Sequence, residues 1–554
     1  MSFLKTALLC SAATFFAAST AHAADLPVKK AVPIEYVRVC GAYGAGFFYI
    51  PGTDTCLRIS GRARFEGGYE TTYSRQSGGN LGDTAGYGSR LRINLDARTQ
   101  TAYGTLRAFV RLDAGSRTGG SYGGGTSGTQ QRIGNAYAAL GQDEFGRAQQ
   151  FVNVDKAFIQ FAGLTAGRAS SFFDFYAHDF EFAGATAGSD VFSTNLLAYT
   201  ATVGNGLSAT ISIEDPTFRR SNVFSPLATT VSAANGSISN FGVTFVPAPI
   251  FVRNAAGTLL ASSAAFQTVD VIQRNEMPDF VGVVRLDQAW GSAQLSAASH
   301  QIDIGNINNT PIANAVTAPA HTNSPYGYAI QGGLKINAPF IAPGDTLYLQ
   351  GAYAKGAQMY TGYCQYTGCY AQTAGTLQGS KFQQYFNDAT VNPVTGQLQL
   401  SDSFTVVGSY LHYWNPEWRS ALFGSYGEMN YSASARNGQG LIFGALNPAG
   451  TQAFGQNAVG TPGSRFYNLS QALRDTYQFV AGANIIWSPV KDLDIGLEGF
   501  YTQIGVKNGR VIDIDKDPTA YTAARVAAIN AGGPVRTATE QSVQQIRFRV
   551  QRDF

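Results

Sequence analysis

The sequence carries little charge for its length. Only 14% of its 554 residues are Asp, Glu, Lys or Arg, against roughly 25% in an ordinary soluble domain. The 39 basic residues nearly balance the 36 acidic ones, which argues against a broad surface for nucleic acid or another polyanion. No stretch is long and apolar enough for a membrane-spanning helix. These absences exclude nucleic-acid binding and a helical membrane protein.

Tryptophan and cysteine are also scarce, with 4 Trp and 5 Cys, whereas Tyr (28), Phe (36) and Gly (63) are abundant. Low charge combined with many Gly, Tyr and Phe residues excludes a helical bundle and a disordered acidic chain. The composition therefore predicts a large β protein, either secreted or embedded in a membrane. The length fits three or four soluble domains or one very large barrel.

Residues 1–23 have the pattern of a secretory signal peptide. Lys5 supplies the positive charge, residues 7–18 are apolar, and Ala21-His22-Ala23 is a small-residue cleavage site. The apolar stretch is too short for a membrane anchor. We therefore predict an exported chain.

Four cysteines follow the predicted signal peptide: Cys40, Cys56, Cys364 and Cys369. An even number in an exported chain favours disulfides. Three pairings of four cysteines are possible, and the local one, Cys40 with Cys56 and Cys364 with Cys369, closes the shortest loops.

Apolar and polar residues alternate strictly along residues 57–66, 90–98, 105–113 and 156–161. A period of two with one apolar face predicts strands that lie between two environments. A soluble sandwich would bury the apolar face, whereas a transmembrane barrel turns it to lipid and its polar face to an aqueous lumen. The signal peptide, the low charge and the abundance of aromatics favour the barrel. Further strands are expected at 196–203, 207–214, 280–287, 291–300, 329–336, 346–353, 404–413, 419–426, 477–487, 493–503 and 543–554.

Short turns alternate with long stretches rich in Gly, Ser, Asn and Ala, as in outer-membrane barrels. The expected long loops are 116–135, 216–275, 303–325, 355–402, 432–472 and 506–541. The last strand alternates cleanly and reaches Phe554. A final strand that closes on an aromatic residue resembles the signal that the barrel assembly machinery recognises.

Residues 37–58, VRVCGAYGAGFFYIPGTDTCLR, resemble the N-terminal signature of the alphaproteobacterial (rhizobial and Brucella-type) general porins. Met277-Pro278-Asp279 with Val281-Gly282, and Trp290-Gly291-Ser292, are similar to further segments of that family. The resemblance implies an all-β, antiparallel transmembrane barrel of sixteen strands, a homotrimer, and passive diffusion of small hydrophilic solutes and ions across the bacterial outer membrane. This chain is longer than the family, and the excess lies in the long loops.

In porins of this kind a third loop folds inward and narrows the lumen. The matching stretch here, residues 171–195, lies between a strand ending near Arg168 and one starting near Leu196. It carries Asp174, Asp179, Glu181 and Asp190 and no Lys or Arg. We expect these acids to face an arginine wall from the first three alternating strands: Arg62, Arg64, Arg90, Arg92, Arg107 and Arg111, with Arg58 and Arg98 near the strand ends. A simpler alternative is that the arginines merely solubilise exposed strands.

No zinc or calcium spacing and no nucleophile motif is present, so we predict neither enzymatic activity nor a cofactor or metal. The expected division is a signal peptide (1–23), a hairpin segment closed by a disulfide (24–56) and the barrel (57–554). Expected partners are outer-membrane lipid and lipopolysaccharide, the assembly machinery and small solutes. A substrate-selective channel, a barrel enzyme and a soluble β-rich adhesin are the alternatives.

Overall fold

The computed structural model describes residues 38–71, 85–118, 149–176, 178–189, 193–221, 223–224, 245–253, 259–271, 273–305, 307–308, 315–316, 322–363, 373–375, 381–392, 395–446, 457–517 and 521–554. The predicted signal peptide, Asp190, Cys364 and Cys369 lie outside these residues, as does most of the expected loop 116–135.

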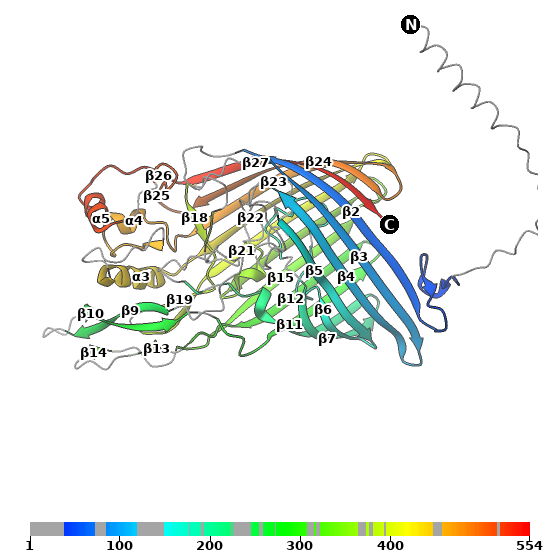
Figure 1. Cartoon of the computed structure of the whole chain (residues 1–554), viewed down its shortest axis with the longest axis horizontal. Helices are drawn as coiled ribbons and strands as arrows, with labels where there is room; N and C mark the ends of the chain where they lie inside the picture. Colours follow the sequence, from blue (N-terminus) through cyan, green and yellow to red (C-terminus); the bar gives the residue numbers. More distant parts are fainter. Residues whose placement is uncertain are drawn as a thin grey trace, which may run out of the picture.

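Sixteen of the described strands form one closed antiparallel barrel (Figure 1), which confirms the predicted fold. Each strand pairs with the next along the chain, and the last pairs with the first: Arg62 lies opposite Asp553, and Glu70 lies opposite Gln545. The barrel strands are β2 (Cys56–Glu70), β3 (Ala85–Thr101), β4 (Gly104–Thr118), β5 (Gln149–Phe161), β6 (Leu164–Ala169), β7 (Thr194–Gly204), β8 (Leu207–Glu214), β11 (Asp279–Gln288), β12 (Gly291–Gln301), β15 (Tyr326–Asn337), β16 (Thr346–Lys355), β21 (Asp402–Tyr413), β22 (Trp418–Asn430), β23 (Thr476–Val490), β24 (Leu493–Val506) and β27 (Glu540–Asp553).

The apolar face of the strands points outward. In β27, Ile546 and Phe548 are 53% and 42% exposed, whereas Gln545 and Arg547 on the other face are 1% and 3% exposed. A soluble sandwich would bury the first pair and expose the second. The burial pattern therefore decides between the two readings of the alternation, in favour of a barrel with a polar interior.

Short turns join the strands at one end of the barrel. Between β7 and β8 the turn is Asn205-Gly206, and both residues have positive φ (48° and 75°), as a tight hairpin turn requires. A Cβ at Gly206 would lie 1.8 Å from the carbonyl oxygen of Asp287, so only glycine fits there. The four tryptophans, Trp290, Trp414, Trp418 and Trp487, all lie in or beside turns of this end.

Long connections at the other end fold into a cap (Figure 1). Its elements are η2 (Pro216–Phe218), β9 (Phe245–Arg253), β10 (Leu259–Asp270), β13 (Ile307–Asn308), β14 (Ala315–Val316), η4 (Gln358–Tyr360), β17 (Thr373–Gly375), β18 (Gln383–Tyr385), β19 (Ala389–Val391), β20 (Leu398–Leu400), α3 (Ala433–Leu446), α4 (Arg465–Leu469), β25 (Val511–Ile512), α5 (Ala523–Asn530) and β26 (Thr537–Ala538). No helix of the described residues is long and apolar enough to cross a membrane.

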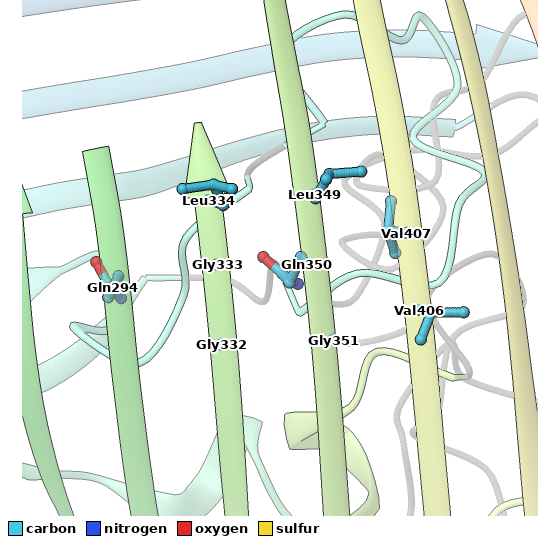
Figure 2. Close-up of a pocket in the computed structure, with 9 residues that line it drawn as sticks. All are labelled: Gln294, Gly332, Gly333, Leu334, Leu349, Gln350, Gly351, Val406 and Val407. Atoms are coloured by element: carbon cyan, nitrogen blue, oxygen red, sulfur yellow. The ribbon is translucent and has the colours of Figure 1, made fainter. Parts of the chain in front are cut away.

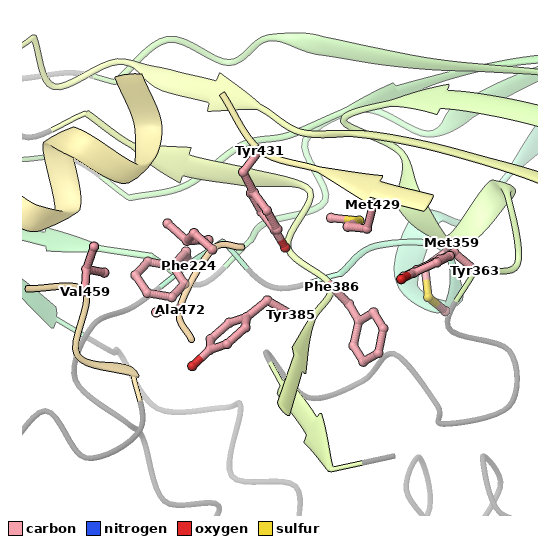
Figure 3. Close-up of a cluster of buried hydrophobic side chains, with 10 residues drawn as sticks. Phe224, Met359, Tyr363, Tyr385, Phe386, Met429, Tyr431, Val459 and Ala472 are labelled. Atoms are coloured by element: carbon pink, nitrogen blue, oxygen red, sulfur yellow. The ribbon is translucent and has the colours of Figure 1, made fainter. Parts of the chain in front are cut away.

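The cap has a hydrophobic core of its own (Figure 3). Phe224, Tyr385, Phe386 and Val459 come from three different connections, and each is at most 2% exposed. No sequence pattern predicted this core, because its apolar residues are scattered and follow no period. Burying them together stabilises short segments of stretches expected only as loops, and the helices α3, α4 and α5 pack into a separate buried cluster with Phe443, Phe466 and Ile529.

Candidate functional site

The connection between β6 and β7, residues 170–193, lies inside the barrel, and we call it the inner loop. Three glutamines on the inward faces of β12, β15 and β16 hold its first half. Gln294 Nε2 donates to the carbonyl oxygens of residues 172–174 at 3.2, 3.3 and 3.2 Å. Gln331 Nε2 donates to the middle one of these at 2.8 Å. Gln350 Oε1 accepts the backbone N–H of Tyr176 at 2.9 Å.

The tip of the inner loop is held by the last three strands. Glu498 of β24 accepts the backbone N–H groups of Phe182 and Ala183 at 2.6 and 2.9 Å. Arg549 of β27 donates to the carbonyl oxygen of Phe182 at 2.7 Å, and its guanidinium lies 4.3 Å from the centre of the Phe182 ring. Asn484 of β23 donates to the carbonyl oxygen of residue 180 at 2.6 Å. The main chain of the inner loop is thus bonded along the β12–β27 arc of the wall.

A buried arginine joins the two ends of the inner loop. Arg219, which follows η2, is 0% exposed. Its Nη2 donates to Asp174 Oδ1 at 2.6 Å and its Nη1 donates to Ser189 Oγ at 2.8 Å. Its guanidinium also lies 4.4 Å from the ring centre of Tyr360 in the cap. Arg219 therefore ties the loop to itself and to the cap.

A second buried cluster joins the barrel to the cap. Asp279 of β11 contacts His300 Nδ1 at 2.7 Å and accepts from the Tyr360 hydroxyl at 2.6 Å. Asp388 of the cap lies 4.0 Å from His300 Nε2 and accepts the backbone N–H of Ser221 at 2.6 Å. Burial raises the pKa of the Asp388 carboxyl, because the charged form loses its hydration.

The predicted loop acids have different surroundings from one another. Asp174 is paired with Arg219. Glu181 is buried and accepts bonds from within its own loop: from the hydroxyl of Tyr176 at 3.0 Å and from two backbone N–H groups, of residues 185 and 186, at 2.8 and 3.1 Å. Asp179 is exposed. Of the three acids that the structure describes, only Asp179 presents its carboxylate at the surface of the loop.

Arginines face arginines across the first strands. Arg62 lies opposite Arg92, and Arg64 lies opposite Arg90. Like charges placed directly opposite each other destabilise a sheet. Carboxylates of the same inward face relieve this: Asp113 pairs with Arg90 at 2.6 Å and with Arg92 at 2.9 Å. The wall is therefore an interleaved array of both signs.

Four more of the predicted arginines, Arg62, Arg98, Arg107 and Arg111, also have carboxylates beside them. Asp96 bridges Arg98 and Arg107, at 2.7 and 2.9 Å. Arg62 pairs with Asp553 at 2.7 Å. Arg111 donates to the side chain of residue 94 at 2.8 Å and lies 3.5 Å from that of residue 155.

The six predicted wall arginines divide by exposure. The side chains of Arg62, Arg92, Arg107 and Arg111 are 29%, 20%, 26% and 23% exposed, whereas those of Arg64 and Arg90 are 10% and 8% exposed. The first four thus reach solvent and the last two support them.

Aromatic rings fix two of the exposed arginines. Phe109 and Phe158 stack on the inward face of β4 and β5, with their ring centres 5.2 Å apart. The guanidiniums of Arg107 and Arg111 lie 5.0 and 5.6 Å from the ring centre of Phe109. Such contacts are attractive and limit the motion of both side chains.

The predicted bridge between Cys40 and Cys56 is present. It closes a hairpin that contains η1 (Gly41–Tyr43) and β1 (Phe48–Tyr49). The Arg98 guanidinium lies 5.1 Å from the ring centre of Phe47, which places the hairpin beside the turn end of β3.

Phe554 pairs with Gly61 of β2 through two backbone hydrogen bonds, of 2.8 and 3.0 Å. A Cβ at Gly61 would lie 2.5 Å from the Phe554 ring. The Phe554 ring therefore packs against the backbone of Gly61, which has no side chain, at the point where the last strand pairs with the first.

A hollow crosses β12, β15, β16 and β21, with Gly332, Gly333 and Gly351 at its floor (Figure 2). A Cβ on the inner side of Gly333 would lie 2.2 Å from the Phe175 ring, so the inner loop fills that side. Leu349 and Val406 beside the hollow are 43% and 49% exposed on the outward face. The hollow therefore opens outward and is separate from the lumen.

The anchors of the inner loop were missed by sequence reasoning. Gln294, Gln331 and Gln350 occupy inward positions of their strands, which the alternation of polar and apolar residues could have predicted. Their hydrogen bonds to the inner loop could not be predicted, because the bonded loop residues lie 120 to 174 positions away along the chain. Glu498 and Arg219 gave no sequence signal.

Comparison with known proteins agrees with this architecture. The family model described as "Porin subfamily" matches residues 25–530. Porin Omp2b of Brucella suis is 29% identical over 440 residues, which cover 76% of this chain and 94% of that protein. Porin Omp2b of Brucella melitensis is 37% identical over 220 residues, which cover 38% of this chain and 54% of that protein.

Among solved structures, the outer membrane channel DcaP of Acinetobacter baumannii is similar, with a TM-score of 0.47 and 12% identity over 91% of this chain and 99% of that one. The family match confirms the resemblance seen in residues 37–58. With its closed barrel and polar lumen, the chain belongs to the porin subfamily and forms an outer-membrane porin channel.

Proposed function

We propose that small hydrophilic solutes and ions cross the channel between the inner loop and the inward faces of β2, β3 and β4, which we call the arginine side. One observation carries this proposal. The backbone of the inner loop is hydrogen-bonded to wall side chains along the β12–β27 arc, from Gln294 to Arg549. Open space for a solute then remains on the opposite side, where Arg62, Arg92 and Arg107 are partly exposed.

On this proposal the arginines and Asp179 set the field across the gap. Asp174 and Glu181 act differently from the sequence-based expectation: their carboxylates hold the shape of the loop and are screened from the solute. A field of fixed charges across a narrow aqueous gap favours hydrated polar solutes over apolar ones. Arginine suits this role because it stays charged and its guanidinium is rigid.

A thiol-labelling experiment tests the position of the gap. Arg107→Cys is reconstituted in a planar bilayer and treated with a bulky charged thiol reagent. We expect the single-channel conductance to fall, because the label enters the gap. Ile211→Cys is the matched control, since residue 211 is 71% exposed on the outward face of β8. An unchanged conductance of labelled Arg107→Cys would place the gap elsewhere.

We also propose that the chain assembles as a homotrimer, as its family resemblance implies. On an unheated detergent gel the chain should migrate near three times its monomer mass and fall to the monomer mass on boiling. A single monomer band in mild detergent would contradict this.

A further inference from the structure

One arginine of the lumen wall lacks a counter-ion. Arg547, on the inward face of β27, is 3% exposed. Its Nη2 donates to Gln545 Oε1 at 3.2 Å, but its Nε and Nη1 have no hydrogen-bond partner. In the described part of the chain no carboxylate forms an ion pair with it. Glu498 lies directly opposite in the register, yet its oxygens are bonded to the inner-loop backbone.

The neighbours of Arg547 add positive charge. Arg549 Nε lies 2.7 Å from Glu66 Oε1, and Arg64 Nη1 lies 3.5 Å from the same oxygen. Around the tip of the inner loop, Arg64 and Arg549 share Glu66, whereas the carboxylates of Glu498 and Glu181 are bonded to groups of the loop itself. Arg547 is the guanidinium of this group that has no carboxylate bonded to it among the described residues, and it is buried.

We propose that Arg547 anchors a binding subsite for a small oxyanion on the inward face of β27, beside the tip of the inner loop. Burying a cation without a counter-charge is unfavourable, and an anion relieves that cost. The guanidinium donors suit the oxygens of a carboxylate or phosphate, to which they form short, charge-assisted bonds. The subsite rests on the proposed function, because the anion reaches it through the lumen. An oxyanion would stay bound at this subsite for a time, whereas it would diffuse through the rest of the lumen without binding.

The test measures current through the whole reconstituted channel in potassium chloride, with inorganic phosphate added in one arm and acetate in the other. In the parent chain we expect the added oxyanion to reduce or interrupt the chloride current in a saturable way. Saturation by phosphate alone assigns a phosphate site, and saturation by acetate as well assigns a general oxyanion site. In Arg547→Gln the half-saturating concentration should rise about tenfold, as expected when a charge-assisted bond is lost.

Arg419→Gln is the matched control. Arg419 also faces the lumen but is fully paired, with Asp494 Oδ2 at 2.6 Å and Ser488 Oγ at 2.7 Å, so its loss should leave oxyanion saturation unchanged. Arg547→Lys keeps the charge and should restore part of the affinity, which keeps the test valid if the glutamine variant folds poorly. Liposome swelling with a neutral pentose checks the proposed function separately. Two results would contradict the subsite without contradicting the proposed function. The first is normal swelling combined with a chloride current that neither anion reduces. The second is the same half-saturating concentration in Arg547→Gln and in the parent chain.

Discussion

The two sides of the lumen are built from different interactions. On the arginine side, charged side chains pair with one another and keep part of their surface exposed, as Arg107 and Asp96 do. On the opposite side, Gln294, Gln331 and Glu498 use their polar atoms to hold the inner-loop backbone. On the proposed function, charge that is paired within the wall still acts on a passing ion, whereas polar atoms bonded to the inner loop set the width of the channel. Field and width are therefore separable by mutation.

We call the β12–β27 arc, which holds the inner loop, the loop-bearing side. The largest effect is expected from Glu498→Ala, which removes one of the anchors on this side. The change leaves two backbone N–H groups and the side-chain amide of Asn484 without their acceptor, at a cost of roughly 3 kcal/mol. We expect a lower thermal unfolding midpoint, a larger conductance and a noisier current in single-channel recordings. Asp494→Asn on the same strand does not contact the loop and should leave the conductance unchanged. A Glu498→Ala channel with parental conductance would show that this anchor does not set the width.

Removal of the disulfide tests how much the N-terminal hairpin, which lies against Arg98, stabilises the arginine side of the barrel. The bridge links residues 16 apart, and a loop of that length is stabilised by about 3 kcal/mol. The pair Cys40→Ser and Cys56→Ser should lower the midpoint of heat unfolding, measured by circular dichroism, and make it less sensitive to reductant. The parent should shift towards the variant when reductant is added. Equal midpoints without reductant would mean that the hairpin does not stabilise the barrel.

Neutralising two lumen charges should change selectivity more than stability. In Arg107→Gln with Arg111→Gln the arginine side loses two positive charges, so the reversal potential in a salt gradient should shift towards cation preference. The control replaces Lys491 and Arg552 by Gln. Residue 491 lies in the exposed turn before β24, and Arg552 is opposite Ala63 on the outward face of the barrel. Parental reversal potentials in the first variant would remove both residues from the gap.

The smallest effect concerns a turn on the loop-bearing side. Burial alone would raise the pKa of the Asp345 carboxyl, but hydrogen bonds from Tyr410 and His412, at 2.6 and 2.8 Å, hold that pKa below its ordinary value. This carboxylate therefore adds stability at neutral pH, and the contribution is lost as the pH falls through the lowered pKa. Asp345→Asn should cost about 1 kcal/mol at pH 7, and less as the pH falls from 7 through the lowered pKa. A constant difference between the two unfolding midpoints across that range would contradict this assignment.

The strands of the barrel were predictable because alternation is a local property. Fifteen of the expected ranges fall on barrel strands, including residues 57–66 in β2 and 543–554 at β27. The missing strand, β6, has six residues interrupted by Gly167, too few to establish a period. Only its end near Arg168 was inferred, from the position of the inner loop.

The sequence predicted which arginines lie on the polar face of the strands, but not which residues they pair with. The alternation placed Arg107 and Arg111 on a polar face, but it could not show that Asp96 bridges Arg98 and Arg107, since strand pairing decides which inward residues meet. The loop acids illustrate the same limit. Nothing in the order of residues 171–195 shows that Glu181 turns into its own loop while Asp179 points out.

The position of the tryptophans determines what an optical experiment on this protein can see. All four lie at the turn end of the barrel, and Trp418 stacks on Trp487 with 5.9 Å between ring centres. Intrinsic fluorescence will therefore follow the immersion of that rim in lipid and the closure of the neighbouring turns. It will be silent on movement of the cap or the inner loop, for which a tryptophan must be introduced, for example in place of Phe182.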